Sequence, residues 1–64
     1  MKKDFFKMKT VWVVMAEVNG VVREVEVCKG KPAAMRELYK LNDFYVKNGI
    51  PDFKVYKLRR ELKK

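Results

Sequence analysis

The chain of 64 residues contains no histidine, no serine, no glutamine and a single cysteine, Cys28. One cysteine cannot form a disulfide within the chain, and without histidine a zinc site of the common cysteine and histidine ligands cannot be assembled. General acid-base and nucleophilic mechanisms also lose their usual side chains. We therefore expect no enzyme activity, no metal site and no cofactor.

Long apolar runs are missing as well. The run over residues 11–15 is far shorter than the roughly 20 apolar residues of a membrane-spanning helix or the core of a signal peptide. A lone thiol is typical of a reducing compartment. These features predict a soluble cytoplasmic protein with no membrane partner. The abundance of lysine, glutamate and valine is typical of hyperthermophiles, although a basic AT-rich coding sequence from a mesophile or its phage gives a similar composition.

The net charge of +8 is concentrated in two segments. Residues 1–9 carry four lysines against Asp4, and residues 54–64 carry six basic side chains against Glu61. Between them, residues 10–53 are neutral, with six basic and six acidic side chains. A binding partner attracted by charge is therefore expected at these two segments.

Asn19-Gly20, between two valine-rich runs, predicts a β-hairpin over residues 10–28, because a type I′ turn needs positive φ at both central positions. A two-residue turn makes the numbers of opposed residues sum to 39, so Val14 is expected opposite Val25 and Trp12 opposite Val27. This register places Trp12, Val14, Ala16, Val21, Val25 and Val27 on one face, with Val22, Glu24, Glu26 and Cys28 on the other.

A helix is predicted over residues 32–48 and a third strand over residues 52–59, followed by a basic tail at 60–64. Pro32 suits the first turn of a helix, and Asn48-Gly49 is a typical helix stop. The spacing of Ala34, Leu38, Leu41 and Tyr45 gives an apolar stripe that can pack on a sheet. The predicted fold is one small α+β domain, residues 1–64, of ββαβ order. Its three-stranded, mostly antiparallel sheet has one helix on one face, and the third strand lies beside either the first or the second.

In this topology both basic segments and the helix start lie at one end of the molecule. We call this end the basic pole and expect it to contact nucleic-acid phosphates through their charges. Its predicted members are Lys7, Lys9, Lys29, Lys31, Lys57, Arg59, Arg60, Lys63 and Lys64. Arg59 and Arg60 are the preferred phosphate contacts because a guanidinium fork matches phosphate geometry. Phe5, Phe6, Trp12 and Tyr56 offer rings for stacking on bases if they are exposed.

One helix covers only one face of a three-stranded sheet, which leaves an apolar patch on the other face, called here the open face. Its predicted members are Val11, Val13, Met15, Val22, Tyr56 and Leu58. Such a patch is typical of an interface. A second copy in a twofold dimer or the N-terminal segment with Phe5 and Phe6 would cover it.

The remaining polar side chains suggest little chemistry. Glu24 and Glu26, on one predicted face, resemble a cation site only weakly and are interpreted as solvated charges. Cys28 beside Lys29 is interpreted as a half-buried strand residue rather than a reactive thiolate. Two functional hypotheses remain. The first is a basic module that binds nucleic acid through its backbone, without sequence specificity and as a homodimer. The second is a protein-interaction or regulatory module, of the kind encoded by viruses or mobile elements, that acts through the open face.

Overall fold

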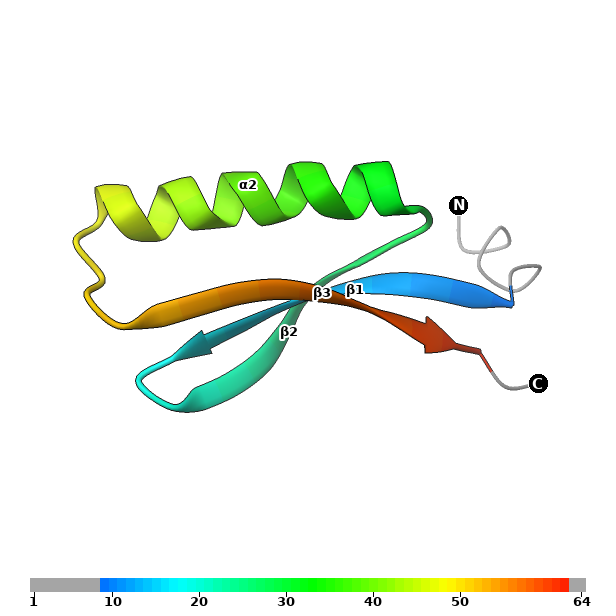
Figure 1. Cartoon of the computed structure of the whole chain (residues 1–64), viewed down its shortest axis with the longest axis horizontal. Coiled ribbons are helices and arrows are strands. Elements are labelled where there is room, and N and C mark those ends of the chain that lie inside the picture. The colour runs from blue at the N-terminus through cyan, green and yellow to red at the C-terminus, as the bar shows by residue number, and fades with distance from the viewer. Residues whose placement is uncertain (1–8, 63–64) are drawn as a thin grey trace.

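The computed structural model describes residues 9–62. Its elements are strand β1 (Thr10–Val18), strand β2 (Val21–Cys28), helix α2 (Lys31–Lys47) and strand β3 (Phe53–Glu61). The three strands form one antiparallel sheet in the order β2-β1-β3, with α2 along one face (Figure 1). The predicted α+β fold of ββαβ order is confirmed, and β3 lies beside β1. Predictions that concern residues 1–8 and 63–64 fall outside the described residues.

The hairpin turn has the backbone that its sequence predicts. Asn19 has a φ of 53° and Gly20 a φ of 84°, both in the left-handed region that a type I′ turn requires. The amide of Asn19 also donates a hydrogen bond to the carbonyl of Asp52 at 3.2 Å. The turn is therefore tied to the segment that leads into β3.

Helix α2 begins and ends within one residue of the predicted bounds. Gly30 occupies the N-cap position, and Pro32 lies in the first turn, where its missing N–H leaves no bond unmade. At the other end Gly49 has a φ of 69°. The amide of Gly49 donates to the carbonyl of Val46 and that of Ile50 to the carbonyl of Tyr45, at 3.1 and 3.0 Å. These two bonds form a Schellman motif that ends the helix.

A β-bulge in β2 makes half of the predicted hairpin register wrong. From Val18–Val21 to Met15–Glu24 the paired residues match the prediction, but the register then shifts by one residue. Val14 pairs with Glu26 and Trp12 with Cys28, which leaves Val25 as the extra residue. A bulge inserts one unpaired residue and so exchanges the faces of everything beyond it. Cys28 and Glu26 therefore lie on the side of α2, and Val27 lies on the open face.

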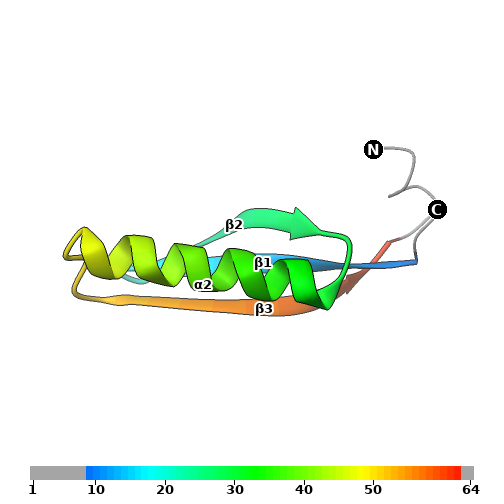
Figure 2. The same cartoon turned by 90° about the horizontal axis from the view of Figure 1, so that it is seen from above.

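Strand β1 is buried on both faces. On the side of α2, Val14 packs with Cys28 and Ala34, and Trp12, Leu38 and Leu41 border this cluster. On the open face, Val11 and Val13 are 2% and 0% exposed. Seen from above, α2 lies over β1 and β3, and β2 lies to one side (Figure 2). Every residue from Val21 to Val27 in β2 is exposed, as this uneven cover implies.

Strand β3 is longer than predicted. It runs to Glu61, so that Arg60 belongs to the sheet and not to a tail, and it pairs with β1 along its whole length. The amide of Leu62 then donates to the carbonyl of Lys9 at 2.7 Å, which continues the ladder by one bond. The side chain of each β3 residue is consequently fixed on one face or the other.

Replacing Gly20 with alanine is expected to lower the free energy of unfolding by about 1 kcal/mol, because an L-residue at a φ of 84° is strained. A Cβ at this position meets no atom within 4 Å, so the loss reflects backbone conformation alone. Urea denaturation of both proteins measures it. Gly30→Ser is the control: the φ of Gly30 is −140° and serine is a favourable N-cap residue, so no loss is expected. Equal losses in both variants would contradict this account of the turn.

Candidate nucleic-acid interface

The chain reverses direction at each connection, and this gathers basic residues at one end. The start of β1, the end of β2, the start of α2 and the end of β3 all lie at the same end of the molecule (Figure 1). The described members of the basic pole at this end are Lys9, Lys29, Lys31, Arg59 and Arg60. Lys57 lies nearer the middle of β3, opposite Val14 and further from this end of the molecule. Lys7, Lys63 and Lys64 lie outside the described residues.

Trp12 is the point where basic side chains from different elements meet. The ammonium group of Lys31, at the start of α2, lies 5.8 Å from the centroid of the Trp12 ring, and that of Lys57, on β3, lies 6.0 Å from it. Arg59 is the residue paired with Trp12 across the sheet. We call these four residues the Trp12 cluster. Each ammonium contact with the ring is worth about 0.5–1 kcal/mol at a partly exposed site.

Trp12 itself is half-buried and packs beside the core cluster of Val14, Cys28 and Ala34. Its position is therefore fixed by the core, while the two lysines reach it on long flexible stems. The sequence assigned Trp12 to the core face and also offered its ring for stacking. What the sequence did not indicate is that Lys31 and Lys57, 26 residues apart in number, would share this ring.

The three cations of the Trp12 cluster keep their charge available. Within residues 9–62, Lys31, Lys57 and Arg59 take part in no ion pair with a carboxylate. Glu61, which pairs with Thr10 one step further along the same face, is the acidic side chain of β3 on this side. Glu26 of β2 and Glu37 of α2 also lie on this side, near Cys28, but in the part of the chain that the structure describes they form no ion pair with Lys31, Lys57 or Arg59. The three cations therefore remain available to an anion.

Arg60 lies on the opposite face from Arg59, because adjacent strand residues alternate. It forms an ion pair with Glu24 of β2. Arg60 is paired with Val11 and Glu24 with Met15, so the ion pair crosses β1 diagonally on the open face. The hydrogen bond from Arg60 lowers the pKa of Glu24, and the same bond raises the pKa of Arg60. The two preferred phosphate contacts are thus separated, and Arg59 alone belongs to the Trp12 cluster.

The open face is less uniform than the sequence predicted. Val11 and Val13, two of its six predicted members, are buried, whereas Val22 and Leu58 are 49% and 37% exposed. Met15 and Tyr56 are half-buried. The bulge adds Val27, 42% exposed, which the unshifted register had assigned to the other face. The exposed apolar surface therefore follows the outer strands and not the centre of the sheet.

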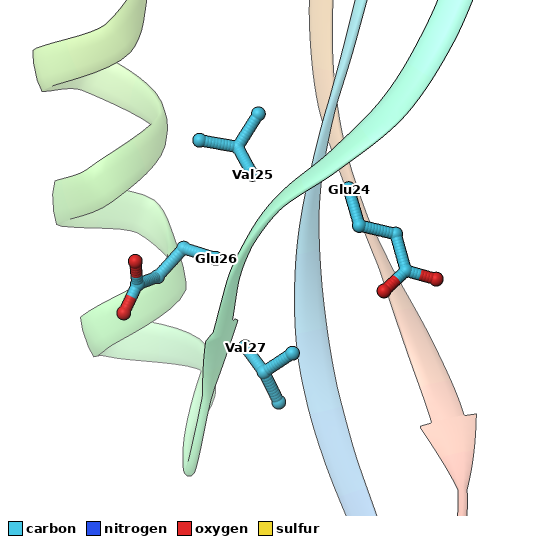
Figure 3. A pocket seen from close by; sticks show the side chains of 4 residues that line it. All are labelled: Glu24, Val25, Glu26 and Val27. Carbon is cyan, nitrogen blue, oxygen red and sulfur yellow. The ribbon is translucent and has the colours of Figure 1, made fainter.

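A hollow on the surface runs along β2 and is lined by Glu24, Val25, Glu26 and Val27 (Figure 3). Figure 3 shows Glu26 on the side of α2 and Glu24 on the opposite side of the strand. The prediction that these carboxylates share a face is wrong, because the bulge lies between them. They do not converge on a common ligand, and no group of three or more metal-ligating side chains occurs in the described part of the chain.

Cys28 is buried, and burial raises the pKa of its thiol above the ordinary value. The carboxylates of Glu26 and Glu37 raise it further. A protonated thiol in the core is a poor nucleophile. Among residues 9–62, no helix has the length and apolar character needed to cross a membrane.

Comparisons of the chain with protein-family models, with curated proteins and with solved structures find no match.

Replacing Arg60 with methionine is expected to raise the pKa of Glu24, because the hydrogen bond that lowers it is lost. In the native protein the folded-state pKa of Glu24 lies below its unfolded-state value. The contribution of the pair is therefore present above the unfolded-state pKa and is lost as pH falls through the folded-state pKa. A carbon NMR titration of the Glu24 carboxyl group measures the change. An unchanged pKa in the Arg60→Met variant would show that the ion pair is not formed in solution.

Proposed function

We propose that this protein binds nucleic acid through phosphate contacts at the basic pole. The observation that carries the proposal is the Trp12 cluster, where Lys31 from α2 and Lys57 from β3 meet at one ring without carboxylate partners among residues 9–62. Arg59 extends the same surface. Cations brought together from separate elements favour an anionic ligand of some length, such as a nucleic-acid strand.

The mechanism is electrostatic. Each phosphate neutralised by a lysine or arginine releases condensed counterions, so affinity falls as the salt concentration rises. Phosphates are the same on every sequence, and binding of this kind positions a strand without reading its bases. The cluster joins residues from β1, from β3 and from the first turn of α2, and the core fixes these elements relative to one another. Cations on an ordered backbone lose less conformational entropy on binding than cations on a flexible tail do, although their side chains are mobile in both.

Replacing Lys57 and Arg59 together with glutamine is expected to weaken binding on all sequences alike. The slope of the logarithm of affinity against the logarithm of salt concentration should become shallower by about 1.4 to 1.8, or about 0.7 to 0.9 per lost phosphate contact. Fluorescence anisotropy of labelled oligonucleotides at several salt concentrations measures it.

The matched control is Lys40→Gln with Lys47→Gln, which removes the same charge from exposed positions on α2. These lysines pair with Glu37 and Asp43 and lie outside the Trp12 cluster. An equal effect of both double variants would assign binding to net charge alone. A slope that does not respond to Lys57 and Arg59 would rule out the cluster as the site.

The second candidate function is protein interaction through the open face, and the partner we propose is a second copy of the chain. The exposed side chains of Val22, Val27 and Leu58 favour it, since exposed apolar surface is typical of interfaces. A twofold dimer would pack two open faces together. Glu24 and Arg60 on the same face pair with each other, so a dimer would not bury either of them as an unpaired charge.

Sedimentation velocity tests this dimer. Val22→Lys combined with Val27→Lys places two charges on the open face and is expected to give a monomer where the native protein sediments as a dimer. Tyr39→Lys with Val46→Lys adds the same charge at exposed positions of α2 and should leave the dimer intact. Val13, at 0% exposure, is unsuitable for the test because a lysine there would disrupt the fold. A native protein that is monomeric at all concentrations would exclude self-association.

A further inference from the structure

We infer that the ligand of the basic pole is single-stranded nucleic acid, with one base stacked on the ring of Trp12. The inference rests on the proposed function and adds the class of nucleic acid that the site accepts. Its starting point is that the Trp12 cluster combines an aromatic ring with cations on either side of it in the fold, Lys31 from α2 and Lys57 from β3.

The ring of Trp12 is suitable for stacking because it is anchored and yet incompletely covered. Its contacts with the cluster of Val14, Cys28 and Ala34 hold it in place, and the residue as a whole is half-buried rather than enclosed. The groups near the ring are ammonium groups at 5.8 and 6.0 Å. These are the ends of mobile side chains, and they can leave the ring without any change in the backbone.

A base is a stronger partner for this ring than a lysine is. Stacking of one base on an aromatic side chain raises affinity by roughly 5- to 150-fold. An ammonium contact at a partly exposed ring contributes only about 2- to 5-fold. A base can therefore replace one lysine on the ring, and the displaced ammonium group, still tethered beside it, is free to neutralise a neighbouring phosphate.

Duplex nucleic acid does not offer this exchange. Its bases are stacked on one another inside the helix, and reaching a base face requires that the base be unstacked and unpaired. Trp12 is held against the core beside the start of α2, so it cannot enter between base pairs as a projecting side chain would. In a single strand the base faces are open, and the same cations contact the phosphates on either side.

The experiment uses the intrinsic fluorescence of Trp12, the sole tryptophan of the chain. The native protein is titrated at low salt with a single-stranded 12-mer, with its duplex, and with an abasic strand of the same length that keeps the phosphates and lacks the bases. Anisotropy of a label on each ligand reports binding independently. We expect quenching with the single strand only, and an affinity for it roughly 5- to 150-fold above that for the abasic strand.

Two variants locate the effect. Trp12→Leu should reduce the affinity for the single strand to that for the abasic strand, and Trp12→Phe, which keeps a ring and most of the packing, should retain part of it. Tyr39→Leu removes an exposed aromatic ring on α2, away from the cluster, and should have no effect. Circular dichroism shows whether each variant folds, and the quenching of the native protein remains decisive if Trp12→Leu does not.

The outcomes separate the two proposals. Salt-dependent binding of all three ligands with equal affinity and unchanged Trp12 fluorescence would overturn the stacking inference and leave the phosphate-binding function in place. No binding of any ligand at low salt would overturn both. Preference for the single strand over the abasic strand, together with quenching, would support both.

Discussion

The pairing of β1 on both of its edges is the constraint on which the rest of the structure depends. Strand β1 is hydrogen-bonded to β2 on one side and to β3 on the other, and neither outer strand has a second neighbour among residues 9–62. Its side chains are also buried on both faces, with Val11 and Val13 on one and Val14 and Ala16 on the other. Small and β-branched residues make this possible, because they fit between the longer side chains of the flanking strands.

The cover on the two faces of β1 differs in kind. On one side Ala34 and the leucines of α2 pack against Val14, which is ordinary core packing. On the other side no element of residues 9–62 lies over the strand, and the ion pair from Arg60 to Glu24 crosses the strand at the level of Val13. An exposed ion pair contributes little free energy of its own. Its role here is to hold two long side chains across an apolar strand.

Local backbone requirements explain what the sequence could predict. Asn19-Gly20 and Gly49 adopt positive φ, and Pro32 suits a first helical turn, so the turn and both helix ends follow from residue type. The bulge at Val25 has no such signal. Beyond the bulge, Val25 and Val27 alternate with Glu26 and Cys28, so either register places one of these two pairs on each face and gives a plausible strand. Only a tertiary contact, the packing of Cys28 against Ala34, distinguishes the two registers. The ion pair between Arg60 and Glu24, which are 36 residues apart, depends on the β1–β2 register and on the β1–β3 register together. The sequence alone therefore did not predict it.

The bulge also determines how the charges are divided between the two sides of the sheet. Glu24 lies on the open face in either register and pairs there with Arg60, whereas the bulge moves Glu26 to the side of α2, where Arg59, Lys31 and Lys57 also lie. Without the bulge Glu26 would join Glu24 on the open face. The proposed nucleic-acid contact and the proposed dimer therefore occupy opposite sides of the sheet. A dimer through the open face would leave both Trp12 clusters accessible, and two linked sites can bind one strand with an avidity that neither has alone.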